Sequence, residues 1–95
     1  MEHKTAPMDL INNEAESRFE LVIDGHIAFV AYNKIPVLTL THTEVPEALG
    51  GKGIGKLLAE KVFTYLQTKG EKARVVCPFL LAYIKRHPEW QSIAF

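Results

Sequence analysis

The residues best suited to chemistry surround a glycine-rich stretch in the middle of the chain. Four glycines occur between Gly50 and Gly55, and Lys52 and Lys56 lie among and beside them. An apolar stripe with the period of an α-helix follows at once: Ile54, Leu57, Leu58, Val62, Tyr65 and Leu66. Glycines before a helix let several backbone N–H groups point toward one anion, and the helix dipole adds attraction. We therefore expect segment 50–56 to bind an anionic group.

Two common phosphate-binding motifs do not fit this stretch. A dinucleotide-binding GxGxxG motif would need its third glycine at Lys56 or at Leu58. The GxxxxGK pattern of a P-loop is present, but Leu57 stands where a Ser or Thr hydroxyl would hold magnesium. We predict a diphosphate that is held without metal and is not cleaved, as in coenzyme A. The alternative is that the glycines only form a tight turn.

Two polar side chains precede the glycines on a predicted strand. Because side chains alternate along a strand, His42 and Glu44 are expected to share one face with Leu38 and Leu40. A carboxylate beside buried leucines is a candidate general base, and His42 is a candidate second base or proton relay. The alternatives are a solvent-facing carboxylate and a buried neutral histidine with a backbone partner.

Cys77 is the only cysteine, and it precedes a helix that is predicted to start at Pro78. A thiol at a helix N-terminus favours the thiolate, so we expect Cys77 to line the site. It could act as a nucleophile or serve as a small buried hydrophobe. A single cysteine rules out an intrachain disulfide and favours a reducing compartment. Scattered histidines and one cysteine lack the ligand spacing of a zinc site, so no metal is predicted.

The elements that position these residues predict an α+β fold with a mixed sheet. The predicted strands are Arg18–Asp24, His26–Asn33, Val37–Val45 and Lys72–Cys77, and the predicted helices are Gly53–Lys69 and one from Pro78 to before Pro88. The Asp24–Gly25 pair predicts a hairpin, so the first three strands form an antiparallel meander. The strand–helix–strand unit that follows is a crossover between parallel strands. Residues 1–16 are expected to be loosely packed, and the tail after Pro88 to be an edge strand or coil.

Size and charge limit the classes of function. A chain of 95 residues predicts one domain. Its 11 basic and 11 acidic residues give no basic face, so a nucleic-acid partner is not expected. No signal pattern and no apolar run of about 20 residues occurs, which predicts a cytoplasmic protein without a membrane segment.

The stretch VPEALGGKGIGKLL resembles the acyl-CoA loop of GNAT-type N-acetyltransferases, whose pattern is Arg/Gln-x-x-Gly-x-Gly/Ala before a helix. Gly53 and Gly55 match its two small positions, whereas Gly50 stands where that family usually has Arg or Gln. Together with VVCPFLLAYIKRHPEW, the chain resembles the small single-domain GNAT-like branch of YjdJ type over about residues 18–90.

The resemblance implies a GNAT-like sheet in which two parallel strands splay apart around acetyl-CoA. The pantetheine would then pair with the strand near Glu44 and Val45. The residues implied to bind the diphosphate are Gly50, Gly51, Lys52, Gly53, Ile54, Gly55 and Lys56. The implied reaction is acetyl transfer to an unidentified amine, with Glu44 as base and Tyr83 as proton donor to the departing thiolate.

Three points stay open at this stage. Tyr83 is expected either to pack in the core or to have a chemical role, and the sequence does not favour one over the other. No helical pattern precedes Arg18, so a non-catalytic acyl-CoA-binding module or a protein-interaction domain built on FLLAYI are alternatives to the enzyme. Both a monomer and a homodimer fit the sequence.

Overall fold

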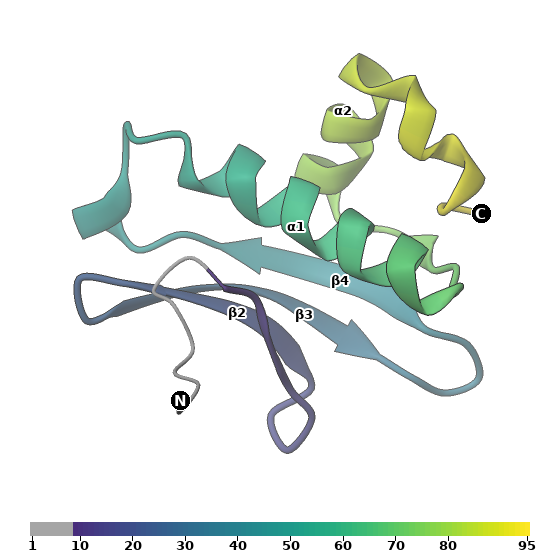
Figure 1. Ribbon diagram of the computed structural model, residues 1–95, viewed down its shortest axis with the longest axis horizontal. Helices are drawn as coiled ribbons and strands as arrows, with labels where there is room; N and C mark the ends of the chain where they lie inside the picture. Colours follow the sequence, from purple (N-terminus) through teal and green to yellow (C-terminus); the bar gives the residue numbers. More distant parts are fainter. Residues whose placement is uncertain (1–8) are drawn as a thin grey trace, which may run out of the picture.

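The computed structural model describes residues 9–95 and shows one mixed sheet with helices on one face (Figure 1). The strands are β1 Ile11–Asn13, β2 Arg18–Ile23, β3 His26–Asn33, β4 Thr39–Glu44 and β5 Arg74–Val75, in that spatial order. The helices are α1 Ile54–Lys69 and α2 Pro78–Arg86, with 3₁₀ turns at Glu47–Leu49 and Pro88–Ser92. Strands β1 to β4 are antiparallel, and β4 and β5 are parallel. The predicted α+β fold is confirmed.

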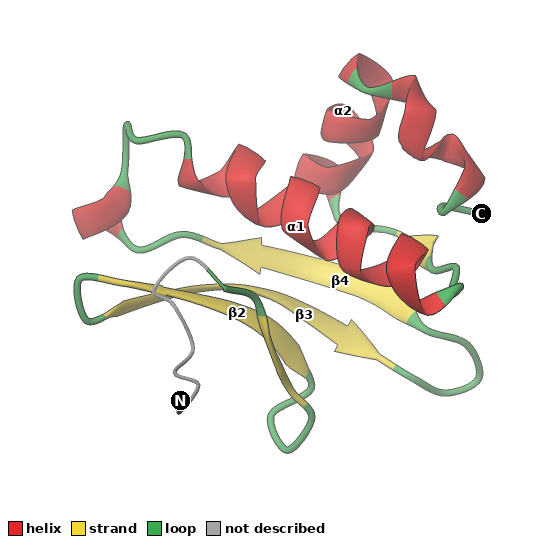
Figure 2. Cartoon of the chain, viewed as in Figure 1, coloured by secondary structure: helices red, strands yellow, loops and turns green. Residues whose placement is uncertain are grey.

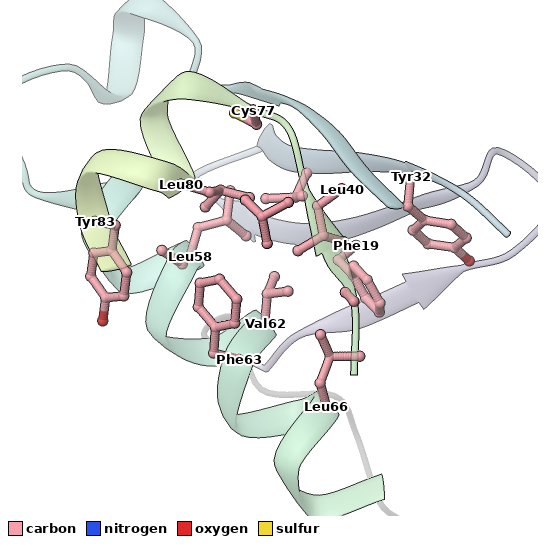
Figure 3. Packing of buried hydrophobic residues seen from close by; sticks show 14 of the residues in the cluster. Phe19, Tyr32, Leu40, Leu58, Val62, Phe63, Leu66, Cys77, Leu80 and Tyr83 are labelled. Atoms are coloured by element: carbon pink, nitrogen blue, oxygen red, sulfur yellow. The ribbon is translucent and has the colours of Figure 1, made fainter. Parts of the chain in front are cut away.

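Figure 2 shows α1 and α2 on the same side of the sheet, where both bury their apolar stripes. Leu58, Val62 and Leu66 of α1 are fully buried against strand residues such as Leu40, as seen in Figure 3. Gly70, in the left-handed conformation, ends α1 as expected. Burying each such side chain contributes roughly 1.5–3 kcal/mol, which makes this layer the main source of stability. The opposite face of the sheet carries none of the described helices (Figure 2).

Two terminal segments differ from the expectation. Residues 11–13, expected to be loosely packed, form β1, which pairs with β2 through Ile11↔Glu20 and Asn13↔Arg18. The Asn12 side chain accepts a hydrogen bond from the Tyr32 hydroxyl and donates one to the Tyr65 hydroxyl, which holds this short strand in place. A polar strand of three residues leaves no periodic pattern in the sequence. Residues 1–8 lie outside the described part. The tail forms a 3₁₀ turn, and a bridge joins Ala94 to Ala73.

A β-bulge in β4 changes which side chains face the core. Tyr32 pairs with Leu40, but the preceding residue Ala31 pairs with His42, so Thr41 is an extra residue. Leu40 therefore points into the core, whereas His42 points to the open face of the sheet. The expectation that Leu38, Leu40, His42 and Glu44 share one face was wrong, because the extra residue reverses the alternation.

The parallel pair separates immediately beyond the bulge. Strand β5 pairs with β4 only at Thr39↔Arg74 and Leu40↔Val75. The Leu40 carbonyl then accepts hydrogen bonds from the amides of both Val76 and Cys77, which ends the ladder. The part of β4 from Thr41 onward thus has no partner strand on its β5 side within residues 9–95.

Within residues 9–95, none of the helices has the length and apolarity needed to cross a membrane.

Candidate functional site

The glycine loop presents an array of unpaired amides. Gly51 and Gly53 have φ of 76° and 70°, a left-handed conformation that glycine adopts without strain. The Gly50 amide donates to the Glu47 carbonyl, but within residues 9–95 none of the amides from Gly51 to Lys56 donates to another protein group. Several of these amides belong to the first turn of α1, where a helix leaves its N–H groups without internal partners. This arrangement is suited to an anion.

Gly55 is required for a different reason. It adopts an ordinary helical conformation, but a Cβ there would lie 2.9 Å from the ring of Phe79, the second residue of α2. The missing side chain lets α2 approach the first turn of α1. Phe79 is 42% exposed and lines the loop cavity, a position that the sequence analysis did not predict.

A cavity of about 440 Å³ follows the inner side of the loop. It is lined by Val45, Pro46, Glu47, Leu49, Gly50, Gly51, Gly53, Ile54, Gly55, Lys56 and Phe79. All predicted coenzyme-binding residues except Lys52 therefore border one cavity, which begins at Val45 where β4 ends. Its size falls in the range of ligand-binding clefts.

His42 and Glu44 form a pair on the open face of the sheet. The His42 Nε2 atom lies 2.9 Å from a Glu44 carboxylate oxygen, and the two side chains are 59% and 55% exposed. The ring of Phe29 on β3 lies edge-on to the imidazole. Glu44 is thus not buried beside leucines as expected, because the bulge turns both residues outward.

Cys77 lies on the opposite face, 3% exposed, at the start of α2. Its Sγ atom is 3.3 Å from the hydroxyl oxygen of Thr43, which the bulge turns toward the core side. This contact joins the ends of the two diverging strands. Thr43 was not among the predicted site residues. The sequence indicates that Thr43 and Glu44 point to opposite faces of the strand, but only the bulge decides that Thr43 points toward Cys77.

Tyr83 is packed as a core residue. Its ring stacks on Phe63 and lies 4.4 Å from the ring of His87. Figure 3 shows the hydroxyl pointing away from Cys77 and Leu40, where the parallel strands separate. The structure therefore does not bring Tyr83 together with the other predicted catalytic residues, and its expected role as proton donor has no geometric support.

The environment of Tyr83 raises the pKa of its hydroxyl. Burial raises the pKa of its hydroxyl above the ordinary 10.0, a hydrogen bond with the Trp90 side chain opposes this, and Glu60 and Glu89 raise it further. Because the unfolded chain ionises first, this group contributes stability that is complete below pH 10 and is lost as pH rises through the folded pKa. Urea unfolding between about pH 9 and pH 11 should show a smaller loss of stability in Tyr83→Phe than in the unchanged protein. Equal losses in both proteins would contradict the prediction.

No group of three His, Cys, Asp or Glu side chains within residues 9–95 is arranged to hold a metal ion. Apart from Lys52 and Tyr83, the predicted site residues lie in three places. The glycine loop forms a cavity, the His42–Glu44 pair lies on the open face, and Cys77 lies on the covered face beside the same strand separation.

Comparison with known proteins identifies the family. Residues 18–93 match the model of the GCN5-related N-acetyl-transferase family. "Protein NATD1" of Xenopus tropicalis is 39% identical over 65 residues, covering 68% of this chain and 60% of that protein. The Danio rerio protein of that name is 36% identical over 70 residues, covering 74% and 64%. The Gallus gallus protein is 36% identical over 52 residues, covering 55% and 47%.

Each match thus spans less than two thirds of the relative's length. The family match covers the meander, the separating parallel strands, the glycine loop and α2. The chain therefore belongs to the GCN5-related N-acetyltransferase family.

Proposed function

We propose that the protein is an acetyl-CoA-dependent N-acetyltransferase that holds the coenzyme diphosphate on the loop from Gly50 to Lys56. The observation that carries the proposal is the row of unpaired amides beside a separated strand pair. Glycine-rich helix N-termini bind diphosphates in this way, and the charges of Lys52 and Lys56 add to the attraction. The unpaired side of β4 near Glu44 and Val45 offers backbone groups to the pantetheine amides.

The proposed reaction is direct transfer of the acetyl group from the coenzyme to the acceptor amine. His42 and Glu44 take part from the open face of the sheet, and Thr43 and Cys77 from the covered face. The acceptor nitrogen attacks the thioester carbonyl carbon, the C–S bond breaks, and the electron pair leaves with the coenzyme sulfur. In this proposal the His42–Glu44 pair takes the proton that the amine loses. The Thr43 hydroxyl and the Cys77 thiol, which lie 3.3 Å apart at the strand separation, are the proposed proton donors to the thiolate.

The buried position of Cys77 favours direct transfer over an acyl-cysteine intermediate. Its thiol is in contact with the Thr43 hydroxyl, and no described histidine lies at hydrogen-bond distance to activate it. The acceptor is an amine that remains to be identified. A cytoplasmic location and a monomeric or homodimeric state are part of this proposal.

Calorimetric titration with acetyl-CoA tests the loop directly. We expect Gly53→Ala to weaken binding about tenfold, because a Cβ at φ 70° costs about 1 kcal/mol and shifts the amide array. Gly25→Ala is the matched control, since Gly25 has φ 79° and equally open surroundings but lies in the β2–β3 turn. The control should lose similar stability and keep its affinity.

Two results would contradict the proposal. One is absence of acetyl-CoA binding at millimolar concentration, and the other is equal loss of affinity in both glycine variants.

A non-catalytic acyl-CoA-binding module is the second candidate function. The observation that favours it is the exposure of His42 and Glu44 on a sheet face that no described helix covers. A face that no described helix covers cannot enclose an acceptor, which favours a module that binds the coenzyme without catalysis. Coenzyme binding without thiol release across a broad panel of amines would favour the module, whereas amine-dependent release would favour the enzyme.

A further inference from the structure

Arg18 and Glu20 form a polar cluster on the open face of the sheet that the chemistry above does not use. Glu20 is 6% exposed, which makes it the one buried charged residue among residues 9–95. Its carboxylate accepts hydrogen bonds from Arg18 Nε at 2.6 Å and from Asn13 Nδ2 at 2.9 Å. A buried carboxylate is costly unless it is paired in this way, and the pairing in turn fixes the position of the arginine.

The guanidinium of Arg18 keeps part of its binding capacity. Its Cζ atom lies 4.5 Å from the centre of the Phe29 ring, so the group is held by a cation–π contact as well as by Glu20. Among residues 9–95, its hydrogen bonds and ion pairs involve only Nε and Glu20. The two terminal nitrogens therefore have no acceptor there, although 27% of the side chain is exposed. A guanidinium held in this way presents free donors whose geometry suits a carboxylate.

The strand register places this arginine on the same line across the sheet as His42. Arg18 pairs with Ala31 of β3, and Ala31 pairs with His42 of β4. With the usual spacing of neighbouring strands, the Cα atoms of Arg18 and His42 are about 10 Å apart. The small side chain of Ala31 leaves space between the two longer ones. The guanidinium and the imidazole both lie near the Phe29 ring, at 4.5 and 6.3 Å from its centre.

We propose that the open face takes a free amino acid as the acetyl acceptor, with its carboxylate on Arg18 and its amine beside the His42–Glu44 pair. The inference rests on the proposed function and names the class of its acceptor. A zwitterion is complementary to a face on which a cation and a carboxylate lie near one ring. The amine and the carboxylate of an amino acid are a few ångströms apart, and a hydrogen bond at each end extends that span to the separation of two such groups.

The test compares amino acids with the amines that they yield on decarboxylation, which keep the amine and lack the carboxylate. The pairs are leucine and isoamylamine, phenylalanine and phenethylamine, histidine and histamine, and serine and ethanolamine. For the unchanged protein with acetyl-CoA, kcat/KM for thiol release should be about tenfold higher with at least one amino acid than with its amine. The reason is that the amine lacks the charge-assisted hydrogen bonds to the carboxylate.

Variants of Arg18 show whether this residue causes the preference. Arg18→Gln should remove most of it by lowering kcat/KM for the amino acid more than for the amine. Arg18→Lys keeps the charge but not the planar group, so it should retain part of the preference. Arg74→Gln is the matched control, because Arg74 is an exposed strand arginine that pairs with Thr39, at the other end of β4 from Glu44. The control should keep the full preference.

The outcomes distinguish this inference from the proposed function. If every amine is used as well as its amino acid, or if Arg18→Gln lowers kcat/KM for both members of a pair alike, Arg18 does not bind an acceptor carboxylate, although the proposed function stands. If acetyl-CoA binds but no member of any pair releases thiol, the acceptor is not an amino acid. If acetyl-CoA does not bind, the proposed function fails and this inference fails with it. The comparison on the unchanged protein needs no variant, so it does not depend on folding of Arg18→Gln.

Discussion

Replacing Glu44 with glutamine is expected to lower kcat for acetyl transfer about a hundredfold or more, the usual contribution of a general base. The change removes the carboxylate that lies 2.9 Å from His42 Nε2. The site then lacks the group that is proposed to accept the amine proton together with His42. The KM for acetyl-CoA should stay nearly constant, because the proposed coenzyme contacts lie in the loop. Thiol release with a reactive amine, measured across pH, gives both constants.

The pH dependence separates a catalytic role from a structural one. Above the pKa of the acceptor amine the nucleophile is already deprotonated, so the deficit of Glu44→Gln should shrink as pH rises. Glu16→Gln is the control, because Glu16 is an exposed carboxylate in the turn between β1 and β2. Unchanged kcat in Glu44→Gln, or a deficit that is the same at every pH, would remove this residue from the mechanism.

Replacing Phe63 with alanine is expected to lower the free energy of unfolding by about 3–5 kcal/mol, the usual cost of a large core truncation. Phe63 is fully buried, and its ring stacks on those of Tyr83 and Trp90 at 6.0 and 5.8 Å. The change opens a cavity where α1, α2 and the C-terminal turn meet. Urea unfolding monitored by circular dichroism measures the loss.

A loss of this size is a large part of the 5–15 kcal/mol that stabilises a typical domain. Phe63→Leu keeps most of the volume and should lose only about 1–2 kcal/mol, which gives a folded variant for comparison. Phe95→Ala is the control, because Phe95 is 63% exposed. If Phe63→Ala were no more destabilising than Phe95→Ala, the described core would be wrong.

The main elements were predictable because each has a strong local pattern. The predicted strand His26–Asn33 has the bounds of β3, and the predicted helix Gly53–Lys69 differs from α1 by one residue. Alternation, the Asp24–Gly25 turn and the apolar period depend only on neighbours in sequence. β1 was missed because three residues without an apolar alternation depend on pairing with β2.

Parts of the candidate site were less predictable because they depend on contacts between distant segments. The left-handed conformations of Gly51 and Gly53 are what a glycine-rich loop before a helix predicts from its own sequence. Glycine is needed at Gly55 for another reason, because a side chain there would collide with Phe79, 24 positions later. Thr43 meets Cys77, 34 positions along the chain, because the pairing of β4 with β5 brings the segments just beyond it close together. Tyr83 turns its hydroxyl away because Phe63 and His87 hold its ring.

The sequence by itself determined the order of β2 to β5 and of the two α-helices, the glycine loop before α1 and the family resemblance, because these follow from local patterns. Only the tertiary structure decided which side chains face one another. One extra residue at Thr41 sends His42 and Glu44 to the open face and Thr43 to Cys77. A bulge forms where it fits the neighbouring strand, so its position is a property of the assembled sheet and not of the strand's own sequence.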